Sequence, residues 1–243
     1  MREIFIFNYL EDRIEQEQNK LKKYKKPAAI LIFVAILSML LSQFATFLTF
    51  VFIVSLFFLI FIGFLAIKHH STIDIFQKGL QGEIALRQTL RLLPDDFVAL
   101  YNLPINNAGD IDCVLIGPKG VFAIEVKNHK GTIIYSEEGW TQIKVGRRGG
   151  EYQGSLKDPR KQLLTNVNKL KSFLAEQNIN KVWIQPILIF TNREAEIVIK
   201  KDPSPIIICR VEDVLNIINS SNKYVSPKLV DRICKLLIKN KQI

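Results

Sequence analysis

Two charged residues in an otherwise apolar stretch are the first candidates for chemistry. Glu125 and Lys127 lie in GVFAIEVKN, residues 120–128, among Val, Phe, Ala and Ile. Side chains two residues apart leave a β-strand on the same face. A buried charge is costly unless it is paired, hydrogen-bonded or bound to a metal ion. The stretch alone fits a salt bridge at the end of a strand as well as it fits a chemical site.

A turn before this strand brings two aspartates toward the pair. The sequence IDCVLIGPKGVFAIEVK is two apolar runs joined by Gly-Pro-Lys-Gly, which is a turn signal. If Pro and Lys are the two turn residues, Asp112 faces Glu125, and by the same count Asp110 faces Lys127. Directly opposed residues share a face, with Cβ atoms ~5 Å apart. A bulge at the second glycine would shift this register by one residue.

Such a cluster is suited to metal-dependent hydrolysis. Two close carboxylates repel each other unless a cation lies between them or one is protonated. Their oxygen atoms suit Mg²⁺ or Mn²⁺, which keep positions open for water and phosphate oxygens. The lysine beside them would orient water or stabilise negative charge on a phosphoryl group. The pattern therefore outlines a phosphodiesterase site, and a buried ion-pair cluster is the alternative.

The spacing resembles a known nuclease signature. Asp112, twelve residues and then Glu125-Val126-Lys127 is similar to the D…(D/E)XK pattern of restriction-endonuclease-like nucleases. The segments GEIALRQTL, GDIDCVLIGPKGVFAIEVKNHKG and DPRKQLLTNV together resemble the nuclease-related domain (NERD) family within that PD-(D/E)XK superfamily. The resemblance covers about residues 79–190 and implies an α/β fold with an αβββαβ core, a mixed sheet flanked by helices.

The resemblance also implies roles for individual residues. Asp112 and Glu125 would be metal ligands, Glu83 would reach the same Mg²⁺ or Mn²⁺ from the first helix, and Lys127 would be the catalytic lysine. Gln162 would project toward the site from the second helix. Two positions depart from the pattern: isoleucine precedes the aspartate where the wider signature has proline, and Asn166 stands where related nucleases often have tyrosine.

Basic residues before the second helix are candidates for phosphate contacts. The chain carries a net charge of +10, from 33 basic and 23 acidic residues, which suits a polyanionic partner or an anionic lipid surface. The candidates for nucleic-acid contacts are Arg147, Arg148, Lys157 and Arg160. An ordinary solvated run of charges explains them equally well.

The remaining pattern predicts the elements that hold these residues. Apolar spacing predicts a helix over 72–93, ended by Pro94, and a second helix from Asp158-Pro159 to about residue 177. Further helices are expected near 211–220 and 226–240. Strand patterns fall at 97–103, 111–117, 121–128, 131–136, 140–145, 182–190 and 205–209, with a loop over 146–158.

An uncharged segment precedes these elements. Residues 27–67 form 41 consecutive positions without a charge, about twice the ~20 residues that one membrane helix needs. Basic residues flank both ends, which places both ends on the cytoplasmic side. A transmembrane hairpin turning near Ser42–Thr46 is the simplest reading, and a single long tilted span or a re-entrant hairpin is the alternative.

The expected organisation is therefore a membrane-anchored cytoplasmic nuclease. It comprises a cytosolic helix over 1–26, a transmembrane hairpin over 27–67 in the lipid bilayer, a NERD-like domain over 72–210, and C-terminal helices over 211–243 packing on that domain. The expected substrate is nucleic acid, with DNA favoured over RNA. A nucleic-acid-binding module of the same fold with little turnover is the alternative, and a scaffold for a membrane partner is a third possibility.

Overall fold

The chain divides into two compact units. The computed structural model describes residues 1–5, 9–41, 46–105, 109–146 and 149–239. One unit is Tyr9–Leu80, and the other combines Met1–Asn8 with Gln81–Ile243. The long helix α2 (Thr46–Leu90) supplies residues to both units.

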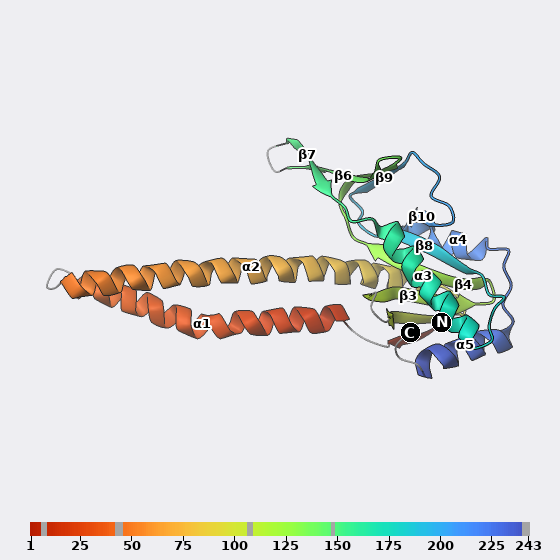
Figure 1. Cartoon of the computed structure of the whole chain (residues 1–243), viewed down its shortest axis with the longest axis horizontal. Helices are drawn as coiled ribbons and strands as arrows, with labels where there is room; N and C mark the ends of the chain where they lie inside the picture. Colours follow the sequence, from red (N-terminus) through yellow and green to blue (C-terminus); the bar gives the residue numbers. More distant parts are fainter. Residues whose placement is uncertain (6–8, 42–45, 106–108, 147–148, 240–243) are drawn as a thin grey trace. The chain divides into compact units, whose positions relative to one another are not determined.

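The unit of Tyr9–Leu80 consists of α1 (Tyr9–Leu41) and the first part of α2, which lie side by side and antiparallel (Figure 1). Polar contacts join the two helices. Glu17 Oε2 lies 2.5 Å from His69 Nδ1, and Tyr24 stacks on the same imidazole. The guanidinium of Arg13 lies 5.6 Å from the centre of the Phe76 ring.

The middle of this unit is apolar and exposed. Phe33 of α1 and Phe47 of α2, for example, are 67% and 71% exposed. Phe47–Leu90 is long and apolar enough to cross a membrane, as judged by length and composition. A two-helix transmembrane hairpin is not shown, and positions 42–45 of the predicted turn lie outside the described residues.

The second unit is built on a mixed six-stranded sheet in the order β1-β2-β3-β4-β8-β10. The central strands β2, β3 and β4 are antiparallel neighbours, whereas β8 runs parallel to both β4 and β10. The strands are β1 (Arg2–Phe5), β2 (Val98–Ile105), β3 (Gly109–Gly117), β4 (Gly120–Lys127), β8 (Ile184–Phe190) and β10 (Ile207–Arg210).

A separate four-stranded sheet has the order β7-β6-β5-β9. Its strands are β5 (Gly131–Ser136), β6 (Gly139–Val145), β7 (Glu151–Ser155) and β9 (Ala195–Ile199). The expected order of helix, three strands, helix and strand is present as α2-β2-β3-β4-α3-β8, with β5–β7 inserted before α3. The α/β class with mixed sheets and flanking helices is confirmed.

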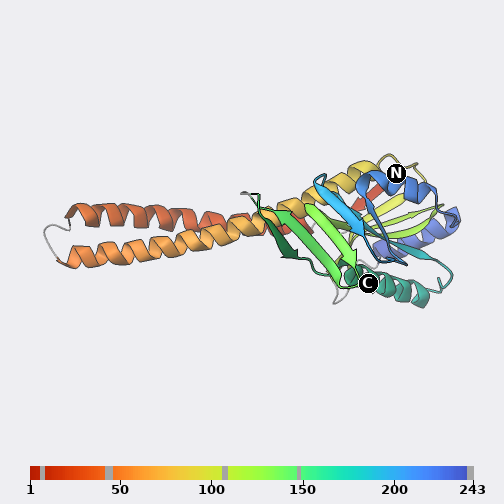
Figure 2. The ribbon, with the colours of Figure 1, turned by 90° about the horizontal axis from the view of Figure 1, so that it is seen from above.

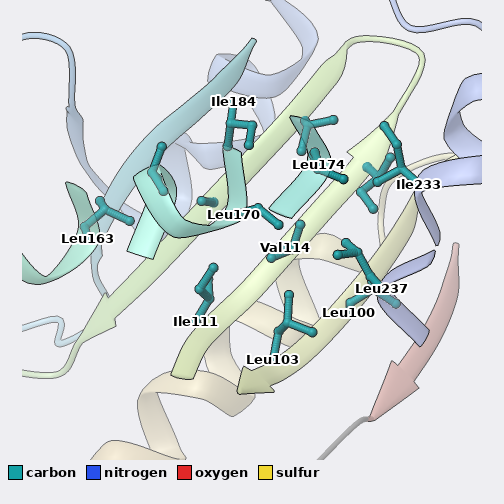
Figure 3. Close-up of a cluster of buried hydrophobic side chains, with 14 of the residues drawn as sticks. Leu100, Leu103, Ile111, Val114, Leu163, Leu170, Leu174, Ile184, Ile233 and Leu237 are labelled. Carbon is teal, nitrogen blue, oxygen red and sulfur yellow. The ribbon is translucent and has the colours of Figure 1, made fainter. Parts of the chain in front are cut away.

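Helices cover both faces of the six-stranded sheet, as Figure 2 shows. The helices α3 (Pro159–Glu176) and α5 (Pro227–Lys239) pack on one face through leucine, isoleucine and valine side chains (Figure 3). The end of α2 and α4 (Val214–Asn219), which follows a 3₁₀ turn at Val211–Asp213, pack on the other. Asp158 caps α3 as predicted, because its Oδ1 accepts the N–H of Arg160 at 2.9 Å.

Three strands were not predicted, and for two of them, β1 and β7, pairing matters more than local sequence. The expected helix over 1–26 is wrong at its start: Arg2–Phe5 is a strand that pairs in parallel with β2, and the helix begins at Tyr9. The predicted loop over 146–158 contains β7, whose sequence EYQGS has little strand character and which pairs with β6. The third strand, β9, pairs in parallel with β5.

Strands β2 and β3 change faces at the same point. Leu100 and Leu103 both lie in the cluster under α3, although residues three apart on a regular strand point to opposite faces (Figure 3). Asn102 between them has a φ of 53°, a left-handed conformation that asparagine tolerates better than most residues. On β3, Ile111 and Val114 likewise share one cluster. The break lies beside the candidate site.

Candidate active site

Asp112 lies where β2 and β3 change faces, opposite Asn102. There its side-chain carboxylate accepts a backbone hydrogen bond from β4. The β3–β4 register runs from Gly117↔Gly120 to Cys113↔Ile124, which confirms the predicted turn. Beyond Cys113, Asp112 Oδ2 accepts the backbone N–H of Val126 at 2.6 Å. The side chain of Asp112 is therefore tied to the strand that carries Glu125 and Lys127.

Glu125 and Lys127 form a tight pair on β4. Lys127 Nζ donates to Glu125 Oε1 at 2.5 Å, and the Glu125 side chain is 1% exposed. The other oxygen, Oε2, is buried and has no hydrogen-bond partner among the described residues. Leaving a buried carboxylate oxygen unpaired costs free energy, so this oxygen is suited to a ligand that the protein itself does not supply.

Glu83 approaches from α2 because its neighbour is glycine. A Cβ atom on Gly82 would lie 2.8 Å from Thr191 Oγ1 and 3.2 Å from Val126 Cγ1, so the helix can lie this close to β4 only without a side chain there. The Glu83 side chain is buried, and Arg87 donates to its Oε2 at 3.1 Å. Glycine and glutamate thus act together to position a carboxylate.

Burial raises the pKa of the carboxyl groups in this cluster, and neighbouring negative charges add to the effect at Glu83 and Asp112. Burial first, and then the charges of Asp112 and Asp110, raise the pKa of Glu83 to about 8, although Arg87 opposes this. Burial followed by the charge of Glu125 raises the pKa of Asp112 well above its ordinary value. Asp110 is also raised, mainly by burial.

Burial and neighbouring charges also shift the pKa values of Glu125 and Lys127 on β4. Burial raises the pKa of Glu125, against the opposing charge of Lys127. Burial alone would lower the pKa of Lys127, but the negative charges of Glu125 and Asp112 outweigh it, and the net pKa is raised. Lys127 therefore stays cationic beside carboxyl groups that resist ionisation.

The donor set fits a hard divalent cation. Carboxylate oxygens are the ligands that Mg²⁺ and Mn²⁺ prefer, and a cation would favour the ionised forms that burial now disfavours. The unpaired Oε2 of Glu125 and the pKa of Asp112, raised first by burial, mark carboxyl groups whose ionised forms a cation would stabilise. Within the described part of the chain, no three His, Cys, Asp or Glu side chains already lie where they would hold a metal ion.

Residues of α3 reach the site differently from the prediction. Gln162 is exposed on the first turns of α3. Asn166, one turn later, is 1% exposed, and its Nδ2 donates to the carbonyl oxygen of Asp110 at 3.0 Å. The residue that replaces the expected tyrosine is therefore the one that contacts the strand of the acidic cluster.

The predicted basic contacts fall into three groups. Arg147 and Arg148 lie outside the described residues. Lys157 is exposed. Arg160 is bound by the protein itself: its guanidinium donates to the Tyr135 hydroxyl and to the carbonyl oxygens of residues 203 and 204, and it lies over the Tyr135 ring.

Sequence reasoning missed Asn102 and Arg87. Asn102 is 2% exposed, and it lies opposite Asp112 between the pairs Tyr101↔Cys113 and Leu103↔Ile111. An asparagine in the middle of a strand pattern is a recognisable signal of a bulge or a left-handed residue. Arg87, four residues after Glu83, follows the spacing of a helical ion pair.

These features define an α/β domain with a buried acidic cluster and a lysine at one end of its central hairpin. The model of the NERD family, the nuclease-related domain, matches residues 78–191. The family predicted from sequence is confirmed over this segment, and a nuclease-related domain suggests a nuclease-like function and interaction with nucleic acid. No curated protein and no solved structure matches the chain.

Proposed function

We propose that the chain is a metal-dependent nuclease that hydrolyses phosphodiester bonds, with DNA favoured as its substrate. The observation that carries this proposal is the pairing of Glu125 with Lys127, which leaves a buried carboxylate oxygen without a hydrogen-bond partner among the described residues. In a purely structural ion pair, a buried carboxylate oxygen without a partner would only cost free energy. The match to the nuclease-related domain supports the same reading.

The residues of the acidic cluster and Lys127 would have different roles in this hydrolysis. Asp112, Glu125 and Glu83 would hold Mg²⁺ or Mn²⁺, which when bound supplies positive charge for the hydrolysis of a phosphodiester. Lys127 keeps its proton because Glu125 and Asp112 raise its pKa, so it presents a fixed positive charge to a phosphoryl oxygen. Glu125 Oε1 orients that ammonium group at 2.5 Å.

The test uses the full chain, purified in detergent. Plasmid, linear duplex, single-stranded DNA and RNA are incubated with Mg²⁺, Mn²⁺ or EDTA, alongside Asp112→Asn and Lys127→Ala. The matched control is Asp231→Asn on α5, whose side chain is 56% exposed and pairs with Lys235. Metal-dependent cleavage that is lost in the two site variants and kept in the control is the expected result.

Two results would contradict the proposed nuclease. Absence of cleavage on every substrate, with nucleic acid bound equally by the wild type and the site variants, would replace the nuclease by a binding module of the same fold. Equal cleavage by Asp112→Asn and the wild type would remove the proposed site.

We also propose that residues 27–67 anchor the chain in a lipid bilayer with its second unit in the cytoplasm. The support is the run of exposed apolar side chains on α1 and α2 and the length of the apolar helix Phe47–Leu90. Partition of the full chain into the membrane fraction, resistant to alkaline washing, is expected. Release by that washing would contradict the anchor.

A further inference from the structure

An exposed tryptophan lies at the end of the six-stranded sheet opposite to the acidic cluster. Trp183 directly precedes β8 and is 42% exposed. Its indole N–H donates to Gln185 Oε1 at 3.2 Å, so the polar atom of the ring is satisfied by the protein. The exposed part of the residue is therefore aromatic surface.

Two lysines from different elements lie over this ring. Lys171 Nζ of α3 is 4.9 Å from the ring centre, and Lys223 Nζ, in the segment after α4, is 5.9 Å from it. An exposed contact between an ammonium group and an aromatic face is worth only ~0.5–1 kcal/mol. The flexible side chains of these lysines can therefore exchange the ring for a stronger anionic partner.

Trp183 also stands between two cavities. One, of about 400 Å³, is lined by Lys119, Lys223, Phe122, Gln185 and the serines that follow α4. The other, of about 420 Å³, is lined by residues of α3 and by the segment before β8. None of the described residues that line either cavity is acidic. Among the described residues, the lining of these two cavities therefore carries basic side chains and no acidic one.

A backbone contact brings the lysines together. The N–H of Val225 donates to the carbonyl oxygen of Pro118 at 3.1 Å, which holds the segment of Lys223 against the turn that carries Lys119. The two lysines are far apart in sequence, and each belongs to a segment that the fold fixes. The arrangement therefore depends on the tertiary structure rather than on a run of basic sequence.

We propose that the Trp183 surface, made of Trp183, Lys119, Lys171 and Lys223, binds single-stranded nucleic acid. A nucleobase stacks on the indole, and the lysines contact the adjoining phosphates. Stacking on an aromatic side chain is indifferent to base identity, and lysines read phosphate charge rather than sequence. The ligand class is therefore an unpaired strand of any sequence.

This site is separate from the acidic cluster. The parallel register of β4 with β8 runs from Val121↔Ile184 to Lys127↔Phe190, so Trp183 and Lys127 lie at opposite ends of the pair, ~23 Å apart over seven residues at ~3.3 Å each. Binding at the Trp183 surface requires neither the carboxylates nor a metal ion. The inference therefore extends beyond the proposed cleavage and is tested without it.

The fluorescence of Trp183 itself reports on binding. The chain has two tryptophans, and Trp140→Phe leaves Trp183 as the only one. This change is mild, because the Trp140 indole nitrogen is buried without a hydrogen-bond partner among the described residues. The full-length Trp140→Phe chain, in detergent and EDTA, is titrated with a twelve-nucleotide oligothymidylate, with an abasic strand of equal phosphate count, and with the corresponding duplex.

Saturable quenching by the oligothymidylate is expected, with binding by the abasic strand weaker by about 5–100-fold because stacking is lost. In the chain that retains Trp140, Trp183→Ala weakens binding of a labelled oligothymidylate by a similar factor, and Trp183→Phe weakens it less. Lys171→Gln with Lys223→Gln lowers the dependence of binding on salt. Lys235→Gln, an exposed lysine on α5, changes neither quantity.

Equal binding of the abasic strand and the oligothymidylate would overturn the proposal, as would unchanged binding by Trp183→Ala with a native circular dichroism spectrum. Tighter binding of duplex than of single strand would also overturn it. Because EDTA excludes metal-dependent cleavage, the titration tests this site alone. Quenching in EDTA, combined with no cleavage in the separate assay with Mg²⁺ or Mn²⁺, would sustain this site and reject the proposed function. Cleavage without quenching would do the reverse.

Discussion

The two ends of the β3–β4 hairpin differ in the residues they carry and in how the two strands are hydrogen-bonded. Near the turn, Ile116 and Val121 form a regular pair in a fully buried, apolar ladder. At the open end, Asp112, Glu125 and Lys127 bring charges into the same sheet, and a side chain replaces a ladder bond. The apolar end stabilises the fold, whereas the charged end holds groups whose pKa values show that their ionised forms are disfavoured. Stability and chemistry are thus separated along one hairpin.

The largest effect is expected at the apolar end. Ile116→Ala removes a side chain that is 0% exposed and should lower the free energy of unfolding by ~2–5 kcal/mol. Urea denaturation of the full chain measures it. Ile116→Val is the matched control, with an expected loss of ~0.5–1.5 kcal/mol. Equal losses for the two variants would mean that the apolar end is not the stabilising half.

The charged end should make stability depend on pH. Folding raises the pKa of Glu83 to about 8 from 4.5, so between these values the unfolded chain loses a proton that the folded chain keeps. In EDTA the contribution of Glu83 to stability is therefore fully present below about pH 4.5, and it should fall as pH rises from about 5 to 8, by up to ~1.4 kcal/mol per pH unit. Asp112 and Glu125, whose pKa values are also raised, act in the same direction.

Thermal denaturation at pH 5, 6.5 and 8 tests this slope. Glu83→Gln should flatten it, whereas Glu176→Gln, an exposed residue on α3, should leave it unchanged. Mg²⁺ should stabilise the wild type more at pH 8 than at pH 5, because a cation favours the ionised carboxylates. A slope of opposite sign would contradict the disfavoured ionisation of the acidic cluster.

Neutralising Asp112 should lower cleavage activity without lowering the stability of the fold. Asp112→Asn keeps an oxygen that accepts the Val126 N–H but removes a charge that burial and Glu125 disfavour. Cleavage should fall at least ~100-fold, while stability in EDTA at pH 8 should rise or stay equal. Single-turnover cleavage and denaturation of the same preparation check both parts. Loss of stability together with activity would assign Asp112 a structural role.

The sequence predicted the hairpin and its charges because both depend on local pattern. The Gly-Pro-Lys-Gly turn fixes the register, and alternation then fixes which side chains face each other. The break at Asn102 was missed although asparagine within a strand pattern signals a left-handed residue, because the matching change of face on β3 depends on the pairing of the two strands. The same holds for β1 and β7, which exist through pairing with distant strand edges, and for Gly82, whose role depends on the contact with Thr191.

Gly82 bears on the charged end of the hairpin, because it sets how near the Glu83 segment of α2 lies to β4. Gly82→Ala would place a Cβ 2.8 Å from Thr191 Oγ1 and should cost ~1–3 kcal/mol despite the better helix propensity of alanine. Urea denaturation measures the cost. Gly150→Ala, where an added Cβ meets nothing within 4 Å, is the control. A stabilised Gly82→Ala would show that α2 is free to move away from β4.

The smallest expected effect distinguishes two residues of α3. Asn166→Ala removes the donor to the Asp110 carbonyl and should lower stability by ~1 kcal/mol, because that buried oxygen loses its partner. Because the contact fixes the start of β3, cleavage should fall modestly as well, mainly through kcat. Gln162→Ala, at an exposed position of the same helix, should change stability by less than ~0.5 kcal/mol. If instead Gln162→Ala reduced cleavage strongly without changing stability, the exposed glutamine would act at the site as the family resemblance implies, and Asn166 would serve only the packing of α3 on the sheet.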